Sequence, residues 1–220
     1  MRVPIALAAA CATTSAVLML SACGGGESSG SDKIQSAATG SPSTSASVST
    51  SASPTATVPA GRPTITFPSD ANDVFEDEHT GDPTKDAVLA DNAQWVESVD
   101  DAIFQGSVKT EAFGFYSTGK ALESSITYIQ GVLDKGYTWT GTVRFFDRKV
   151  TLLGGDTASV IYCSDESEEF PKHRATGKID NVLTTKDSYV LYNTHLKKDA
   201  QGVWQTDNVL STRGAEQCQP

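Results

Sequence analysis

The sequence predicts an α+β domain over residues 64–220, with helices first and a curved antiparallel sheet after them. Two observations carry this prediction. Up to Gly136, apolar residues repeat every three or four positions, which is the spacing of a helix. Beyond Gly136 they alternate with a period of two residues in segments rich in Val, Ile, Thr and aromatic residues, which is the pattern of strands. Every Trp and Tyr, and all but one Phe, lie from Val74 onward, so only this part can build a core. Helices followed by antiparallel strands predict helices packed on one face of the sheet.

The helical part is predicted to hold a long helix and two shorter ones. Asp82-Pro83 reads as an N-cap followed by proline at the first helical position, and Gly106 as the stop. Residues 112–116 form a short second helix, and a third ends at Gly136. The apolar faces of the first and third helices consist of Val88, Leu89, Trp95, Val96, Val99, Ala102 and Ile103, and of Leu122, Ile126, Ile129 and Leu133.

Four strands are predicted after the helices. Gly154–Asp156 and Asp199–Gly202 read as hairpin connections between them. Ahead of the first helix, Thr64–Pro68 is predicted to be a short edge strand, and residues 70–82 an acidic lead-in. The four strand ranges are Thr138–Leu153, Thr157–Asp165, Asp187–Lys197 and Val203–Leu210.

Residues 1–22 read as an export signal, with Arg2 before a short apolar run. The stretch from Leu20 to Cys23 resembles the lipobox of bacterial lipoproteins. That resemblance implies cleavage between Ala22 and Cys23, lipid on the Cys23 sulfur, and attachment to the outer face of the cell membrane. Two alternatives stay open: a second lipobox spelling that ends at Cys11, and a plain secreted protein cleaved after an alanine.

Residues 23–63 are nearly all Ser, Thr, Ala, Gly and Pro, and no apolar periodicity survives there. Such a segment cannot bury enough surface to offset its ordering entropy. We therefore expect a disordered tether, with a root-mean-square reach of roughly 35 Å.

The net charge is −10 and the pI is about 4.7, with basic residues scattered along the chain. This pattern disfavours nucleic acid as a partner. No cofactor is indicated by any motif.

Cys163 and Cys218 remain once Cys11 leaves with the signal and Cys23 carries lipid. An isolated pair in an oxidising compartment predicts a disulfide, here closing a loop of 55 residues. The alternative, two thiolates on a metal ion, lacks CxxC spacing and nearby histidines. No metal site is predicted.

Three other motifs are interpreted as structural. Gly114–Ala121 spells most of a P-loop and includes a Ser-x-x-Lys, but it lacks the magnesium-binding hydroxyl and follows no strand. The histidines, at positions 79, 173 and 195, are far apart. The acidic run from Asp165 to Glu169 is read as a solvated loop after a strand, although calcium or a basic peptide is an alternative.

Five segments of the domain carry a resemblance to known proteins: Thr80–Asp82, Lys85–Ala90, Tyr162–Ser167, Lys186–Tyr192 and Gly202–Gln205. These segments are similar to those of uncharacterised actinobacterial lipoproteins of the Streptomyces type. The order of elements, which ends in a Gly-x-Trp hairpin, also resembles the cone-shaped nuclear-transport-factor-two-like fold that ketosteroid isomerase shares.

The cone fold implies a cavity between sheet and helices, and homodimers are common in it. A lipid-anchored envelope domain that binds a small apolar ligand or an envelope protein is the first hypothesis. A small isomerase or hydrolase with a cavity carboxylate such as Asp100, Asp101 or Asp165 is the second, and a purely structural protein the third. Aromatic candidates for the cavity lining are Trp95, Tyr116, Tyr128, Trp139, Phe145, Tyr162 and Tyr192.

Overall fold

The computed structural model describes residues 61–220. The predicted export signal, the lipid-bearing Cys23 and almost all of the tether lie outside the described residues. Within residues 61–220, no helix is both long enough and apolar enough to cross a membrane.

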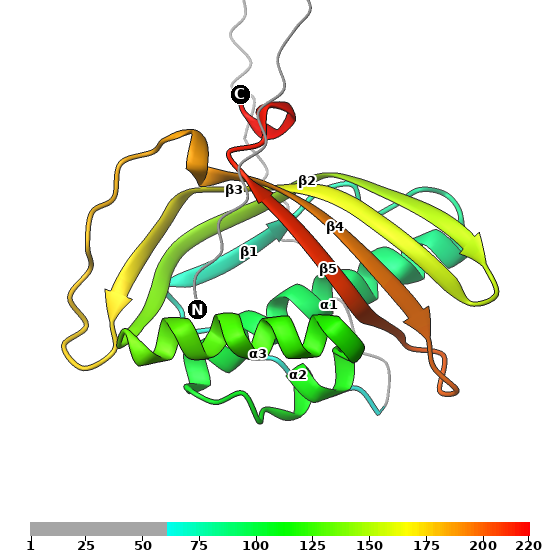
Figure 1. The fold of residues 1–220 in the computed structure, drawn as a ribbon, viewed down its shortest axis with the longest axis horizontal. Helices are drawn as coiled ribbons and strands as arrows, with labels where there is room; N and C mark the ends of the chain where they lie inside the picture. The colour runs from blue at the N-terminus through cyan, green and yellow to red at the C-terminus, as the bar shows by residue number, and fades with distance from the viewer. Residues whose placement is uncertain (1–60) are drawn as a thin grey trace, which may run out of the picture. The chain divides into compact units, whose positions relative to one another are not determined.

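Three helices lie on one side of a five-stranded sheet that arches over them (Figure 1). The prediction of an α+β domain is therefore confirmed. The elements are β1 (Ala71–Phe75), α1 (Pro83–Gln105), α2 (Glu111–Tyr116), α3 (Gly119–Asp134), β2 (Tyr137–Gly154), β3 (Thr157–His173), β4 (Tyr189–Lys198) and β5 (Trp204–Arg213), with 3-10 turns at Lys186–Ser188 and Glu216–Cys218.

The predicted signals set the ends of α1. The Asp82 side chain accepts hydrogen bonds from the backbone N–H groups of Thr84 and Lys85, and Pro83 occupies the first turn. Gly106 ends the helix with a φ of 73°, a left-handed conformation that glycine adopts without steric cost.

The first strand is not where the sequence predicted it. Residues 64–68 form no strand, and β1 lies instead in the stretch that was read as an acidic lead-in. Phe67 packs its ring against Phe104 and Trp139, at centroid distances of 5.0 and 6.0 Å, so this segment serves the core rather than the sheet. The strand pairs in parallel with β2, and the sheet is therefore mixed rather than purely antiparallel.

The third strand is much longer than predicted, because it continues from Asp165 to His173. The long β2 strand offers unpaired backbone groups as far as Tyr137, and β3 satisfies them despite its polar side chains. The acidic run is thus part of the sheet, and its interpretation as a solvated loop is wrong.

The C-terminus packs on the outer, convex face of the sheet. Cys163 of β3 and Cys218 are joined by a disulfide, with their Cα atoms 5.5 Å apart. Ala215 is buried beside them. The disulfide therefore holds the chain end on the face opposite the helices.

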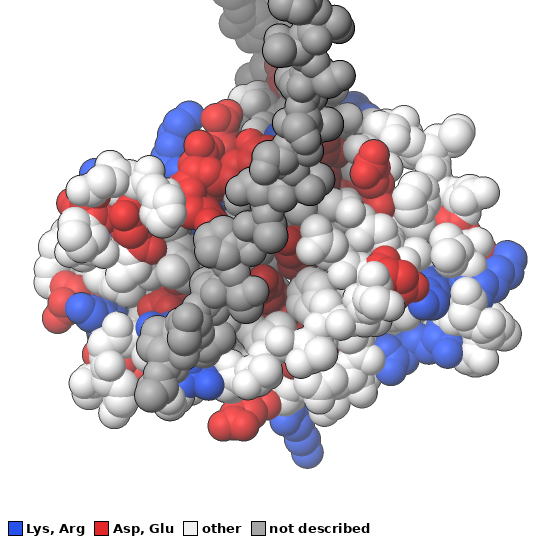
Figure 2. Space-filling view, turned by 180° about the vertical axis from the view of Figure 1, so that it is seen from behind, with Lys and Arg blue, Asp and Glu red and all other residues white. Residues whose placement is uncertain are grey.

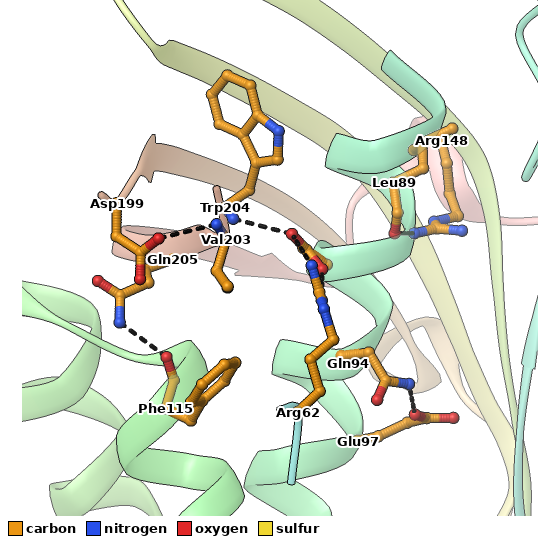
Figure 3. Close-up of polar contacts among 11 residues, drawn as sticks. Arg62, Leu89, Gln94, Glu97, Phe115, Arg148, Asp199, Val203, Trp204 and Gln205 are labelled. Carbon is orange, nitrogen blue, oxygen red and sulfur yellow. Dashed lines mark hydrogen bonds and ion pairs between the residues drawn. The ribbon is translucent and has the colours of Figure 1, made fainter. Parts of the chain in front are cut away.

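Buried polar contacts tie α1 to β5 (Figure 3). The Asp91 carboxylate, 2 % exposed, accepts a hydrogen bond from the Trp204 backbone N–H at 2.8 Å and forms an ion pair with Arg62. Arg62 falls within the predicted tether, yet its side chain packs against the helix. The neighbouring Arg148 is also buried, and it donates to the Leu89 carbonyl oxygen at 2.6 Å.

Candidate functional site

A cavity of about 420 Å³ lies between the concave face of the sheet and helices α1 and α3. Aromatic and aliphatic side chains form most of its wall. Because Tyr128 lines it and is 55 % exposed, the cavity is open to solvent on that side. The lining aromatic residues are Trp95, Tyr128, Trp139, Phe145, Tyr162 and Tyr192.

Six of the seven aromatic candidates from the sequence thus lie around this cavity. Tyr162 and Tyr192 are direct partners on β3 and β4, and their rings stack at 5.1 Å. Tyr116 is the exception, because it is fully buried in the core between α2 and α1, with the Arg62 guanidinium 5.8 Å from its ring centre. The expectation that Tyr116 lines the cavity is therefore wrong.

Four charged side chains face the same cavity: Asp100 from α1, Glu166 and Glu169 from β3, and Arg213 from β5. Asp100 accepts a hydrogen bond at 3.0 Å from the indole N–H of Trp139. Arg213 is already engaged, since it pairs with Glu166 at 2.6 Å and donates to the Asp187 carbonyl oxygen at 2.6 Å. Among residues 61–220, neither Asp100 nor Glu169 forms an ion pair.

A bulge in β3 explains how two glutamates three positions apart face one side. The register runs from Thr142 opposite Glu168 to Arg144 opposite Asp165, so β3 carries one residue more than β2 across this interval. The extra residue resets the alternation of side chains, and both Glu166 and Glu169 then point inward.

Gly141 makes room for the strand beside this bulge. It lies opposite Glu169 with a φ of 105°, and a Cβ at this position would collide with the backbone carbonyl oxygen of Glu168. Only glycine accepts both this conformation and this close approach.

Burial changes the titration of the cavity carboxyls. It raises the pKa of Glu169 to about 8, helped by the negative charges of Glu166 and Asp100 and opposed by Arg213. Burial also raises the pKa of Asp100 to about 7, against the hydrogen bond from Trp139, which lowers it. At neutral pH both groups are therefore partly protonated.

A second carboxyl lies behind Asp100. Asp73 of β1 is buried, and burial together with the nearby Asp100 charge holds its pKa well above its ordinary value. Two carboxyls so placed share one proton more readily than they ionise together.

The other two carboxylates proposed from the sequence lie elsewhere. Asp101 is buried, and it accepts hydrogen bonds from Gln105 at 2.8 Å within its own helix. Asp165 pairs with Arg144 at 3.4 Å and accepts from the Ser167 backbone N–H, and it does not line the cavity. Only Asp100 of the three is in place for chemistry there.

A second lobe of about 390 Å³ adjoins the first. The two lobes share Tyr128, Trp139 and Glu169. The wall of the second lobe is otherwise largely apolar, apart from Lys135 and a second carboxylate, Asp180, which is paired with Lys178 at 2.9 Å. Glu169 therefore stands at the junction between two apolar spaces.

The remaining motifs form no site. Each histidine lies beside a different carboxylate, and within residues 61–220 no three His, Cys, Asp or Glu side chains are grouped so as to hold a metal ion. The P-loop-like segment spans the turn from α2 to α3. On the face drawn in Figure 2, acidic side chains are widespread, and the basic ones gather mainly along the edge.

No family model matches the chain, and no curated protein does. Solved structures with a similar arrangement include a ketosteroid isomerase-like protein from Erwinia carotovora atroseptica (14 % identity, 58 % of this chain and 93 % of that one, TM-score 0.37). Another is the intermembrane space region of chloroplast protein ARC6 (13 % identity, 58 % of this chain and 97 % of that one, TM-score 0.36). A third is a cystatin-like domain of unknown function from Nostoc punctiforme (19 % identity, 61 % of this chain and 78 % of that one, TM-score 0.35). At these TM-scores the likeness carries no argument about function.

The site is therefore a solvent-accessible, mostly apolar cavity with carboxyls from both the helix side and the sheet side. Such a cavity can enclose a small molecule and orient it through a few polar contacts. The sequence missed Glu166 and Glu169, because only the bulge places them inside.

Proposed function

We propose that this chain is a lipid-anchored protein of the bacterial cell envelope whose domain, of the nuclear-transport-factor-two-like class, binds a small, largely apolar molecule without transforming it. The observation that carries the binding role is the aromatic-walled cavity between helices and sheet. A domain built only for structure would gain stability by filling this space, because each unfilled volume in a core costs dispersion contacts.

Native mass spectrometry of the chain purified from an actinobacterial host tests this role. We expect a small molecule to accompany the wild-type chain and to be lost from Val209→Trp, which places an indole in the cavity. Leu210→Trp is the matched control, because Leu210 is the next residue, points outward and is 64 % exposed. A chain that neither carries a small molecule nor binds one from a panel of apolar compounds would contradict the proposal.

The envelope location rests on the sequence of residues 1–23. Cys23→Ser is expected to release the protein from the membrane fraction, whereas Cys11→Ser should leave it bound. A Cys23→Ser protein that stays in the membrane fraction would remove lipid on this cysteine from the proposal.

A second candidate function, proton-transfer catalysis of the isomerase type, is favoured by Asp100. Its carboxyl lies in the cavity with a pKa near 7, which suits a general base. The hydrogen bond from the Trp139 indole N–H holds this carboxyl in place, and a separate donor such as a tyrosine hydroxyl would have to stabilise the enolate oxygen of the substrate. Exchange of deuterium next to a ketone carbonyl, lost in Asp100→Asn, would support this function over simple binding.

A further inference from the structure

The cavity combines apolar walls with an excess of negative charge. Three carboxyl groups line it, and one guanidinium. The guanidinium of Arg213 is committed to Glu166 at 2.6 Å and to a backbone carbonyl oxygen. In the first lobe an anionic ligand would therefore meet no free cation among the described residues, and it would face Asp100 and Glu169 instead. The one lysine near this space, Lys135, lines only the second lobe.

The two uncompensated carboxyls lie on facing walls. Asp100 comes from α1 below and Glu169 from β3 above, and Trp139 lines the wall with both. Glu169 has no hydrogen-bond partner within residues 61–220, so its oxygens are available to a ligand. Burying a carboxylate without a partner is costly, and a ligand that supplies a positive charge recovers that cost.

The two lobes of the cavity indicate the shape and polarity of the rest of the ligand. Glu169 and Trp139 stand at their junction, with Val143 and Phe145 on one side and Val132 and Pro171 on the other. Aromatic rings around a carboxylate also favour a cation, because the ring faces attract positive charge.

We propose that the cavity selects an amphipathic organic cation, with an ammonium group held between Asp100 and Glu169 and apolar groups in the adjoining lobes. This inference rests on the proposed binding function and specifies its ligand. The partial protonation of both carboxyls in the empty cavity adds a measurable consequence: a bound cation favours their ionised forms and so displaces protons.

Isothermal titration of the purified chain in a non-ionic detergent tests this selectivity with three compounds of similar shape: 2-(1-naphthyl)ethylamine, 2-(1-naphthyl)ethanol and 1-naphthylacetate. At pH 7 the amine is expected to bind at least about tenfold more tightly than the alcohol, and the carboxylate more weakly than both. Titration of the amine in two buffers of different ionisation enthalpy should reveal net proton release.

Glu169→Gln is expected to weaken binding of the amine about tenfold and to leave the alcohol within about twofold. The control is Glu168→Gln, which removes the same charge from the adjacent, exposed residue and should change neither affinity. Proton release by the wild-type chain does not depend on any variant folding, so it tests the proposal independently.

An alcohol that binds as tightly as the amine, or amine binding without proton release, would overturn the cation inference and leave the binding function standing. Displacement of the amine by millimolar Mg²⁺ or Ca²⁺, with the same sensitivity to Glu169→Gln, would also overturn it in favour of a metal ion. Failure of all three compounds to bind, together with a bare chain in native mass spectrometry, would instead contradict the binding function itself.

Discussion

Replacing Glu169 with glutamine separates the role of this side chain in the cavity from its role in folding. Glutamine keeps the size and shape of the side chain and removes its charge. Glu169 makes no ion pair within residues 61–220, so the substitution breaks no salt bridge there. The stability of the variant relative to the wild type therefore reports the cost of ionising this buried carboxyl.

The magnitude follows from the two titration states. The pKa of Glu169 is about 8 in the folded chain and 4.5 for an exposed glutamate, so the folded state holds a proton that the unfolded state has lost. Stability therefore falls as the pH rises through this window, and the full penalty applies above pH 8. The difference between the two pKa values sets a ceiling of about 5 kcal/mol on the stability lost by ionising Glu169. Because the cavity is open to water, we expect Glu169→Gln to gain about 2 to 4 kcal/mol over the wild type at high pH.

Urea unfolding at a series of pH values from 4.5 to 9 measures this effect. Glu169→Gln should gain stability over the wild type steadily as the pH rises, whereas Glu168→Gln should follow the wild-type curve. Asp100, Glu166 and Arg213 face the same space and are present in all three proteins, so their contribution is common to every curve. A difference in the free energy of unfolding between Glu169→Gln and wild type that stays constant across this pH range would refute a buried, uncompensated carboxyl at this position.

Three other variants test the frame around the cavity. Replacing Cys163 and Cys218 with alanine should lower the free energy of unfolding by up to about 4 kcal/mol, measured by urea, since the bridge closes a loop of 55 residues. Arg62→Ala should cost about 3 kcal/mol because it leaves Asp91 buried without its cation, and a loss below about 0.5 kcal/mol would exclude Arg62 from the domain. Gly141→Ala should cost more than about 2 kcal/mol, and wild-type stability there would refute the tight strand approach at the bulge.

The helices were predictable because their signals are local. The cap at Asp82, the stop at Gly106 and the apolar repeat between them lie within one continuous segment. The α+β arrangement followed from the same reasoning, because a change of period from helical to alternating marks the change of element.

The strand errors have a common physical cause. Pairing depends on what a partner strand offers, and the composition of one segment does not reveal it. Residues 64–68 look like a strand but pack into the core, and β3 continues through acidic residues because β2 is long enough to pair with them. Parallel pairing of β1 with β2 joins segments far apart in sequence, which no local pattern indicates.

The candidate site was predictable only in part. Aromatic residues of the helices and strands gave most of the cavity wall, and Asp100 was one of three carboxylates named without a motif that could choose between them. Tyr116 was assigned wrongly, because core and cavity positions share the same apolar pattern. Glu166 and Glu169 were missed, because a single bulge decides which face of the strand they occupy.

The indole N–H resonances offer the most direct test that this cavity is the binding site. The chain has three tryptophans, of which Trp95 and Trp139 line the cavity and Trp204 lies outside it. In a ¹H–¹⁵N spectrum recorded while 2-(1-naphthyl)ethylamine is added, we expect the signals of Trp95 and Trp139 to shift and that of Trp204 to stay in place. A titration that moves only Trp204, or none of the three, would contradict the assignment of the cavity as the functional site.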